Sequence, residues 1–484
     1  MKKIIPPGVY TIHNDRAYQL QEEVMTGVYG DNPYADTFTH KRKYEIGLDF
    51  EGMEDVTIEA YGATMLVDGF MIAAALQHCK NITIRGLTID LKRRAYSQGT
   101  IVKIEDGSFC VRFGKEKWIS PNMPAPRMMI TDPKTGHIAA VLASAVVSDA
   151  VKEWAGEDTI RFFYQLDKKL EGCTVSVCHT WHSCPSILIH EAENIRLEDV
   201  TIYSHPGMGI VGHRSKDITL ERVRIIPAPG SYFSSNTDAT HFVSCRGKLT
   251  YKDCEFAGHG DDAANIHSFY QTITRDCGDN IYEMACMVRY DTHSLHLDHP
   301  DKGDVVEFSY KKDIAPVGEY QVVESWPDYE GYCCRVKLDR ALPKDCVGNY
   351  ITPVTQLPEL HFCGCKVRDH IARGLLIRTR NALVENCTFS HCTMEAIYVA
   401  AESYWNESAA SREVVIRNNK TENCGLKIEV VAEEMGQPLH ENIRIEENQI
   451  DGDMILRHID GLELLNNKIS GKLKIYDCIH VSER

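Results

Sequence analysis

The sequence has no apolar run long enough to cross a membrane as a helix, and no stretch at its start that is typical of a secretion signal. Its first residues, MKKIIPPGVYTI, contain two lysines but neither a continuous apolar segment nor small residues at a cleavage position, and they indicate a first β-strand. We therefore expect no membrane partner and a cytoplasmic location. A secreted protein is the alternative if a signal peptide has been removed from the chain.

Basic residues are also fewer than acidic residues. The 484 residues contain 53 Lys and Arg against 69 Asp and Glu, which gives a formal net charge of −16. Nucleic acids and anionic membranes bind basic surfaces, so this balance argues against both as partners.

The 18 cysteines never form a CxxC pair, which is the spacing that zinc sites use. In a chain of this length they are more typical of buried, reduced side chains than of a disulfide framework. The sequence thus predicts no metal ion and no other cofactor.

What the sequence does contain is a short strand with a polar break, repeated along the chain. It occurs as DVTIEAYGAT, NITIRGLTID, NIRLEDVTIY and DITLERVRII, and later as VVIRNNKT, IRIEENQI and LELLNNKI. Apolar residues alternate in each copy, and Asn, Asp or Gly follows where the chain must turn. Neighbouring copies are 19 (Ile445 to Leu464) to 32 (Val384 to Ile416) residues apart, the period of a solenoid. We predict an all-β fold, a right-handed parallel β-helix.

Two long gaps interrupt this period. The counterpart of Ile84 is Leu197, 113 residues later, and that of Tyr251 is Phe362, 111 residues later. Both gaps close on similar segments, YQLDKKLEGCTVSV and VKLDRALPKDCVGNYI. Their period-two pattern, broken by Gly and Pro, predicts two inserted small β-barrel domains.

These gaps divide the chain into five parts. We expect N-terminal β-helix rungs in residues 1–90, a first β-barrel in 91–180, rungs that carry an acidic cluster in 181–270, a second β-barrel in 271–352 and C-terminal rungs in 353–484.

The acidic cluster lies in NTDATHFVSCRGKLTYKDCEFAGHGDDAANIH, where Asp238 precedes the pair Asp261–Asp262 by 23 residues. This interval is about one rung, so the carboxyls are expected on neighbouring strands, which lie about 4.8 Å apart. Successive strand residues point to opposite faces, so both members of the pair reach one pocket only at a bend. Gly258 and Gly260 favour such a bend.

Paired carboxyls suit the hydrolysis of glycosidic bonds, because one must be protonated to assist the leaving oxygen while another is ionised. Adjacent Asp261 and Asp262 would repel each other if both were ionised, which favours a proton on one of them. A simpler interpretation is that aspartates at β-helix turns only cap backbone groups. A metal ion held by Asp261, Asp262, His241 and His267 is a further alternative, although calcium sites normally use more oxygen ligands.

A second polar patch lies in IARGLLIRT and EAIYVAAESYWNES. Its polar and aromatic residues are Arg373, Glu395, Tyr398, Glu402, Tyr404, Trp405 and Glu407. Aromatic rings beside carboxyls are common in sugar sites, because a pyranose presents an apolar face and several hydroxyls. An ordinary loop with a buried tryptophan explains the pattern equally well.

The two patches together resemble glycoside hydrolase family 110, the inverting exo-α-1,3-galactosidases. The resemblance rests on TDATHFVSCRGKLTYKDCEF followed by DDAANIH, with RGLLIRT, VENCTF and YWNES in addition, and it covers most of the chain from Ile4 onward. It implies that Asp238, Asp261 and Asp262 are catalytic. Asp261 would be the proton donor, and Asp238 and Asp262 would hold the attacking water.

The resemblance also implies a substrate class: terminal α-galactosyl oligosaccharides or glycoconjugates, hydrolysed with inversion and without a cofactor. The substrate-binding residues that we expect in the two patches are Asn236, His241, Asn265, His267, Arg373, Glu402, Trp405 and Glu407. The chain has Ala239, Ser268 and Ala401–Glu402 where the family usually has Gly, Gly and a Gly–Asp pair. These departures leave the linkage and the aglycone open, and the sequence is also compatible with a homo-oligomer.

Two other classes of protein stay open. β-Helix polysaccharide lyases and polygalacturonase-like hydrolases act on acidic polymers, which the acidic cluster and the net charge disfavour. A non-catalytic carbohydrate-binding solenoid would use the aspartates only as turn caps. Activity on a chromogenic α-galactoside separates a hydrolase from a binding protein.

Overall fold

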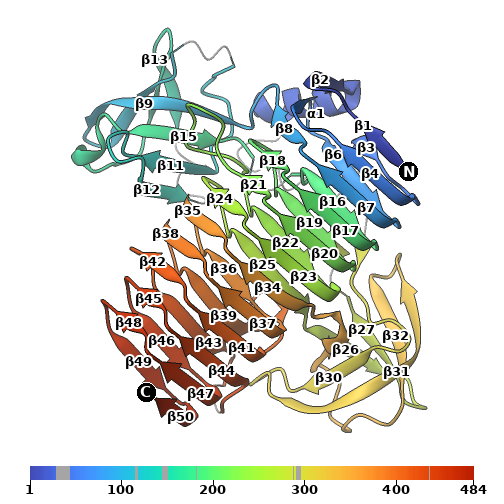
Figure 1. Ribbon diagram of the computed structural model, residues 1–484. Helices are drawn as coiled ribbons and strands as arrows, with labels where there is room; N and C mark the ends of the chain where they lie inside the picture. The colour runs from blue at the N-terminus through green and yellow to red at the C-terminus, as the bar shows by residue number, and fades with distance from the viewer. Residues whose placement is uncertain are drawn as a thin grey trace.

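The computed structural model describes residues 1–28, 44–114, 118–143, 151–180, 183–286, 288–289, 296–434 and 437–484. Within them the chain winds into a parallel β-helix of three sheets, with two inserts that stand off its sides (Figure 1). The two termini lie at opposite ends of this solenoid. The predicted parallel β-helix is therefore confirmed.

The first sheet contains the strands of the repeat that is visible in the sequence. In spatial order they are β1 (Lys2–Ile4), β4 (Glu54–Glu59), β7 (Lys80–Arg85), β17 (Glu193–Glu198), β20 (Lys216–Glu221), β23 (Arg246–Lys252), β34 (Glu359–Cys363), β37 (Arg380–Glu385), β41 (Arg412–Arg417), β44 (His440–Glu446), β47 (Ile459–Leu465) and β50 (Ile479–Glu483). Ile84 pairs with Leu197 and Tyr251 pairs with Phe362. The rungs on either side of each insert thus stack in the register that the repeat in the sequence predicts.

The second sheet carries the acidic cluster. Its strands are β3 (Ile46–Asp49), β6 (Ile72–Gln77), β16 (Ile187–His190), β19 (Ile210–His213), β22 (Thr240–Val243), β25 (Ala264–Phe269), β36 (Leu375–Ile377), β39 (Ile397–Glu402), β43 (Leu426–Val431), β46 (Met454–Arg457) and β49 (Leu473–Tyr476). A short strand, β40 (Glu407–Ser408), pairs antiparallel with β25.

The third sheet closes each rung. Its strands are β2 (Gly8–His13), β5 (Ala63–Asp68), β8 (Thr88–Leu91), β18 (Thr201–Ile202), β21 (Arg224–Ile225), β24 (Glu255–Ala257), β35 (Lys366–His370), β38 (Thr388–Cys392), β42 (Lys420–Glu422), β45 (Gln449–Ile450) and β48 (Lys468–Ile469).

Asn and Asp residues make the tight turns between sheets. Asp55, Asn81 and Asn194 have φ values of 54°, 56° and 54°, a left-handed conformation that these short polar side chains tolerate. Their side chains also stack from rung to rung, because Asn81 Nδ2 donates to Asp55 Oδ1 at 2.7 Å and Asn194 Nδ2 donates to Asn81 Oδ1 at 2.7 Å. The polar break in the repeat is thus both a turn and a ladder between rungs.

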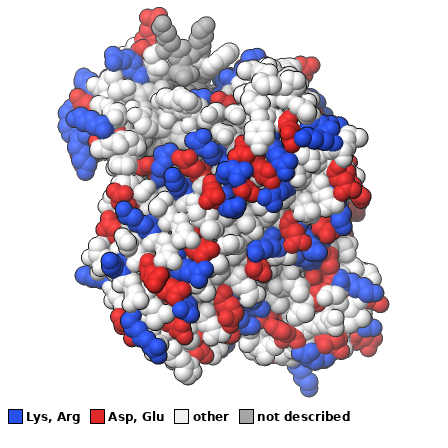
Figure 2. Space-filling view, in the orientation of Figure 1, with Lys and Arg blue, Asp and Glu red and all other residues white. Residues whose placement is uncertain are grey.

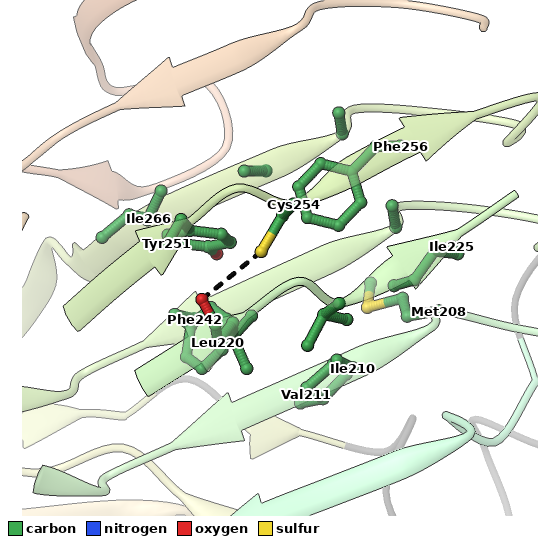
Figure 3. Close-up of a cluster of buried hydrophobic side chains, with 14 of the residues drawn as sticks. Met208, Ile210, Val211, Leu220, Ile225, Phe242, Tyr251, Cys254, Phe256 and Ile266 are labelled. Carbon is green, nitrogen blue, oxygen red and sulfur yellow. Dashed lines mark hydrogen bonds between the residues drawn. The ribbon is translucent and has the colours of Figure 1, made fainter. Parts of the chain in front are cut away.

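The alternating apolar residues fill the interior of the solenoid. Figure 3 shows this core in the rungs that carry the acidic cluster, where Leu220, Phe242 and Phe256 are fully buried. Cys254 Sγ lies among them and donates to the carbonyl oxygen of Leu220 at 3.4 Å. All 18 cysteines are free thiols, and most are buried, as expected for small apolar side chains.

The first insert is an antiparallel sheet whose edges do not close into a barrel within the described residues. Its strands in spatial order are β12 (Ile138–Ala143), β11 (Arg127–Thr131), β15 (Thr174–Cys178), β9 (Tyr96–Glu105), β10 (Ser108–Arg112), β14 (Thr159–Phe162) and β13 (Lys152–Gly156), with a 3₁₀ turn η1 at Lys168–Leu170. The prediction of a first β-barrel is therefore wrong.

The physical reason is that both faces of this sheet are covered. Met128 and Val177 pack into the insert's own core, whereas Met129 and Cys178 on the opposite face pack against Phe233 of the solenoid. A sheet that uses the solenoid as its second layer need not curl onto itself.

The second insert is a closed barrel, as predicted. Its strands are β26 (Gln271–Asp276), β27 (Ile281–Ala285), β32 (Cys333–Leu338), β31 (Pro316–Asp328), β30 (Val305–Ser309) and β33 (Tyr350–Pro353). A hairpin of β28 (Val288–Arg289) and β29 (His296–Leu297) and a 3₁₀ turn η2 (Val354–Gln356) accompany it.

One α-helix, α1 (Asp15–Met25), is found in the described part of the chain near the N-terminus. Asn14 caps it, because its side chain accepts the backbone N–H groups of Arg16 and Ala17. In the described residues no helix combines the length and the apolar character that crossing a membrane requires. On the face seen in Figure 2, acidic and basic side chains are interspersed.

Candidate active site

The three aspartates converge where β22 and β25 begin. Thr240 pairs with Ala264, so this rung is 24 residues long and Asp262 lies level with Asp238. The Asp262 N–H donates to Asp238 Oδ1 at 3.2 Å. One oxygen of each carboxyl of Asp238, Asp261 and Asp262 lies within 4.8 Å of the others.

A bend between β24 and β25 lets both Asp261 and Asp262 face the same space. Gly258 has a φ of 67°, which favours glycine. A Cβ at Gly260 would lie only 2.2 Å from the carbonyl oxygen of Asn236, so no other residue fits there without a shift. The two glycines therefore make the approach of the neighbouring rungs possible.

Burial separates the three carboxyls into two kinds. The side chains of Asp238 and Asp262 are 7% and 5% exposed, whereas that of Asp261 is 31% exposed. Burial, reinforced by the charge of Asp261, raises the pKa values of Asp238 and Asp262 well above the ordinary range. The cluster therefore retains protons under conditions in which solvent-exposed aspartates are ionised.

A chain of hydrogen bonds connects Asp238 to two buried histidines. His267 Nδ1 donates to the carbonyl oxygen of Ser268 at 2.7 Å, and burial lowers the pKa of His267 to about 3. Neutral His267 therefore accepts at Nε2 the proton of His241 Nε2, 2.9 Å away. The remaining nitrogen, His241 Nδ1, lies 2.6 Å from Asp238 Oδ2, so these two atoms share one proton.

Two arginines hold the other aspartates. The Arg373 N–H donates to Asp262 Oδ1 at 2.8 Å, and its guanidinium lies 3.5 Å from Asp262 Oδ2. Arg127, which β11 of the first insert supplies, lies 3.5 Å from Asp261 Oδ2 and donates to the carbonyl oxygen of Asn236 at 2.9 Å. The first insert thus contributes directly to the acidic cluster.

Two stacked histidines fix the backbone of Asp261. His259 Nδ1 and His370 Nδ1 lie 2.8 and 3.2 Å from its carbonyl oxygen, and their rings are 4.1 Å apart. Burial lowers the pKa of His370 to about 4 and that of His259 well below its usual range. Both rings are therefore neutral: His259 donates to Asp261, and His370 donates mainly to the carbonyl oxygen of Ile371 at 2.7 Å, with Asp261 as its longer contact.

The second polar patch is organised around Arg378, which is fully buried. Its guanidinium pairs with Glu402, lies 2.6 Å from Glu407 and donates to Asn265 Oδ1 at 3.2 Å. Burial opposes the ionisation of Glu407, but the buried guanidinium of Arg378 favours its charged form, and its pKa is lowered to about 2. Glu407 is therefore a fixed negative charge beside the acidic cluster.

Trp405 and Tyr404 project from the loop between β39 and β40. Their side chains are largely exposed, and the two rings meet edge to face at 5.0 Å. The interpretation of Trp405 as a buried loop residue is therefore wrong. An exposed aromatic pair between Glu402 and Glu407 offers a platform for an apolar sugar face.

The structure joins most of the predicted site residues into one network, but it places them at different depths. Asp261, Arg373 and Trp405 are open to solvent to some degree, whereas His267 is fully buried. Asn236 lies behind the site, where its amide donates to the backbone carbonyls of Ala95 and Thr180 at 3.3 and 3.2 Å. Asn236 and His267 therefore support the site wall instead of facing its space.

The sequence pattern did not point to Arg127 or Arg378. Arg378 lies in the RGLLIRT motif, from which we selected only Arg373. Arg127 gave no signal, because it is far from the aspartates in the sequence and is delivered by the fold of the first insert.

The fold and the site define the class of protein: it is a parallel β-helix in which carboxyls from neighbouring rungs lie together in one cluster. A family model described as "Right handed beta helix region" matches residues 351–480. Among solved structures, the Family 28 exopolygalacturonase of Yersinia enterocolitica aligns over 99% of this chain and 72% of its own, at 11% identity and a TM-score of 0.42.

The chain is similar over most of its length to α-1,3-galactosidases. It is 26% identical to α-1,3-galactosidase A of Bacteroides fragilis over 478 residues, which cover 92% of this chain and 77% of that protein. It is 24% identical to α-1,3-galactosidase B of Parabacteroides distasonis over 406 residues, which cover 78% and 66% of the two chains. The predicted resemblance to these galactosidases is thus confirmed over most of the chain, on a parallel β-helix fold.

Proposed function

We propose that the protein is an exo-acting glycoside hydrolase that releases terminal α-1,3-linked galactose with inversion of configuration. The observation that carries this proposal is the convergence of the carboxyls of Asp238, Asp261 and Asp262, with one oxygen of each within 4.8 Å of the others. Glycoside hydrolysis needs a protonated and an ionised carboxyl at the same bond. The similarity to α-1,3-galactosidases supports galactose as the sugar and α-1,3 as the linkage.

The charges around the site favour a neutral sugar. Each arginine near the acidic cluster is already paired with a carboxyl: Arg127 with Asp261, Arg373 with Asp262, and Arg378 with Glu402 and Glu407. A uronic acid would bring a further carboxylate to a space that these acidic side chains already surround. The alternative of an enzyme for acidic polymers is therefore disfavoured on electrostatic grounds.

Depth within the site supports distinct roles for the three aspartates. We assign proton donation to Asp261, because the leaving oxygen must reach the donor and Asp261 is the most exposed carboxyl of the three. Asp238 and Asp262, which lie deeper, would hold the attacking water. Inversion is proposed from the family resemblance and not from the spacing, since the oxygens lie closer together than the roughly 6.5–9.5 Å typical of inverting enzymes.

The experiment that tests the function measures both the product and its anomer. We expect galactose release from a linear α-1,3-galactoside, with the β-anomer appearing first in a proton NMR time course. Matched α-1,4-, α-1,6- and β-1,3-galactosides serve as controls, and they should release far less. Initial formation of the α-anomer would contradict inversion, and a full lack of galactose release would contradict the proposed function.

Replacement of the proton donor should have an effect that depends on the leaving group. Asp261→Asn is expected to lower kcat/KM by about 10²–10⁴-fold for a disaccharide. It should affect an aryl galactoside with a good leaving group far less, because that group departs without a proton. Steady-state kinetics on the two substrates give the comparison. Equal losses on both would remove Asp261 from the role of acid.

A further inference from the structure

A second cluster of histidines and carboxylates lies apart from the acidic cluster. It forms at the turns that follow β3, β6 and β16, three neighbouring strands of the second sheet (Figure 1). Its members are Glu51, His78, His190 and Glu191. His190 is level with His213, Val243 and His267 on successive rungs. The cluster is thus three rungs, or about 14 Å, from the histidine beside the acidic cluster.

Three ligand atoms of this cluster converge. Glu191 Oε2 lies 3.0 Å from His78 Nε2 and 4.0 Å from His190 Nε2, and all three atoms fit within 4.8 Å. Zn²⁺ held tetrahedrally at about 2.0–2.1 Å keeps its ligand atoms about 3.3 Å apart, so small side-chain rotations suffice. The two imidazole planes cross at 76°, so in-plane lone pairs from both rings can meet at one point.

The outer contacts of these side chains are those of a metal site. His78 Nδ1 lies 2.7 Å from Glu51 Oε1 and donates its proton there, which leaves Nε2 as the ligand atom. The other oxygen of Glu191 accepts from Arg214 Nε at 3.1 Å, so Oε2 is the one turned to the histidines. A ligand histidine normally donates its second ring N–H to a carboxylate or carbonyl, as His78 does here.

His190 has an equivalent support through a second histidine. His213 Nε2 donates to Asp298 Oδ1 at 2.7 Å, and both side chains are fully buried. His213 Nδ1 lies 3.2 Å from His190 Nδ1, within hydrogen-bond distance, so the second ring nitrogen of His190 has a partner there. His190 Nε2 is the ring nitrogen that faces Glu191, so it is the atom placed to bind a metal.

We propose that His78, His190 and Glu191 form a binding site for one divalent transition-metal ion such as Zn²⁺. Two imidazoles and a carboxylate suit Zn²⁺ and its neighbours in the first transition row better than Mg²⁺ or Ca²⁺, which prefer oxygen ligands. His78 and Glu191 are partly exposed, so the ion has a path from solvent, and water completes the coordination. The ion takes no part in the proposed hydrolysis.

Another cluster of histidines and a carboxylate differs from this one in the orientation of its rings. His137, Asp369 and His391 also lie within 4.8 Å of one another. The rings of His137 and His391, however, stack nearly parallel at 3.6 Å and 11°. Lone pairs in two parallel planes do not converge on one ion, so that cluster does not fit a metal.

The proposed ion would join two rungs that are distant in the sequence. His78 and Glu191 are 113 residues apart, and the first insert lies between them. A metal bound to both turns would lock β6 against β16 at the point where the chain returns from that insert. The expected benefit is structural, and binding to the folded state alone raises the melting temperature.

The test is metal binding to the full chain after dialysis against a chelator and then into chelator-free buffer. Isothermal titration with ZnCl₂ should give one site per chain, and Zn²⁺ should raise the melting temperature. His78→Asn and Glu191→Gln should each weaken binding at least tenfold. Asn tolerates the φ of 48° at His78, so this substitution removes the ligand without straining the turn. Glu51→Gln, which alters only the outer contact, should cost about 10–100-fold in affinity.

His480→Asn is the matched control. His480 also has a positive φ, 51°, and pairs with one carboxylate, Asp460, at 2.6 Å. Its loss should leave the affinity unchanged. Cobalt-loaded protein should show no thiolate charge-transfer band, because the free cysteines take no part. Binding below one equivalent, equal affinity in wild type, His78→Asn and Glu191→Gln, or a thiolate band would overturn the proposal.

Discussion

Asp238→Asn is expected to reduce galactose release by about 10²–10⁴-fold and yet to melt at a higher temperature than the wild type. The loss follows from the proposed role of Asp238 in holding the attacking water. The gain follows from burial, because Asp238 is 7% exposed and its pKa is raised well above the ordinary range. An amide can keep both contacts: its oxygen accepts the Asp262 N–H, and its NH₂ group donates to His241 Nδ1.

The raised pKa of Asp238 determines how the gain in melting temperature depends on pH. A carboxyl whose pKa is higher in the folded than in the unfolded protein binds its proton more tightly when folded. Its favourable contribution is complete below the unfolded pKa, about 3.9 for Asp, and is lost as the pH rises through the folded value. The difference in melting temperature between Asp238→Asn and the wild type should therefore be small at pH 4 and grow towards pH 8.

Asp253→Asn provides the matched control for this comparison. Asp253 lies at an exposed turn with a φ of 53°, a conformation that Asn also adopts. Neither its activity nor its melting temperature should change appreciably at any pH. A melting temperature of Asp238→Asn at or below that of the wild type at pH 8 would show that the buried carboxylate stabilises the fold.

Retained activity in Asp238→Asn would have a different meaning. It would return this aspartate to the role of a turn cap, and the proposed function would have to rest on Asp261 and Asp262. Kinetics therefore test the catalytic role of Asp238, and thermal melting tests the effect of its burial on stability.

The sequence revealed the acidic cluster because a solenoid converts sequence spacing into spatial proximity. Asp238 and Asp262 are neighbours since the chain returns to the same place after one rung, and a period read from apolar residues is enough to see it. The interval of 23 residues runs from Asp238 to Asp261, the first aspartate of the pair, whereas the rung is 24 residues long. The backbone register aligns the second one instead.

The spacing of the repeat does not reveal which residues of an insert lie at the site. Arg127 reaches Asp261 across 134 residues because the first insert folds back on the solenoid. The shape of that insert also differs from the predicted barrel, since alternating apolar residues do not show whether the second face of a sheet meets its own barrel or another domain. Met128 and Met129, adjacent in β11, pack against different cores.

Arg378→Met is expected to destabilise the fold by about 3–5 kcal/mol in the free energy of unfolding. Arg378 is fully buried and neutralises both Glu402 and Glu407. Methionine fills much of the same volume but leaves the two carboxyls without their counter-charge. Because Glu407 also approaches Asn265 and His267, galactose release should fall as well.

The effect should shrink on acidification, and the pH range follows from Glu407. Its folded-state pKa of about 2 lies below the unfolded value of about 4.3. Its stabilising contribution is thus present above pH 4.3 and is lost as the pH falls towards 2. The deficit of Arg378→Met, measured by urea denaturation, should therefore be largest near pH 7 and smaller at pH 3.

Two further variants make the result specific. Arg378→Lys keeps one charge but not the fork that serves two carboxylates, so its deficit should be intermediate. Arg444→Met removes an exposed arginine that pairs with Glu446 at 2.6 Å, and surface pairs of this kind contribute about 0–1 kcal/mol. Adding Glu402→Gln and Glu407→Gln to Arg378→Met should recover part of the stability but none of the activity. A deficit of Arg378→Met no larger than that of Arg444→Met, at pH 7, would show that the buried carboxyls do not depend on Arg378.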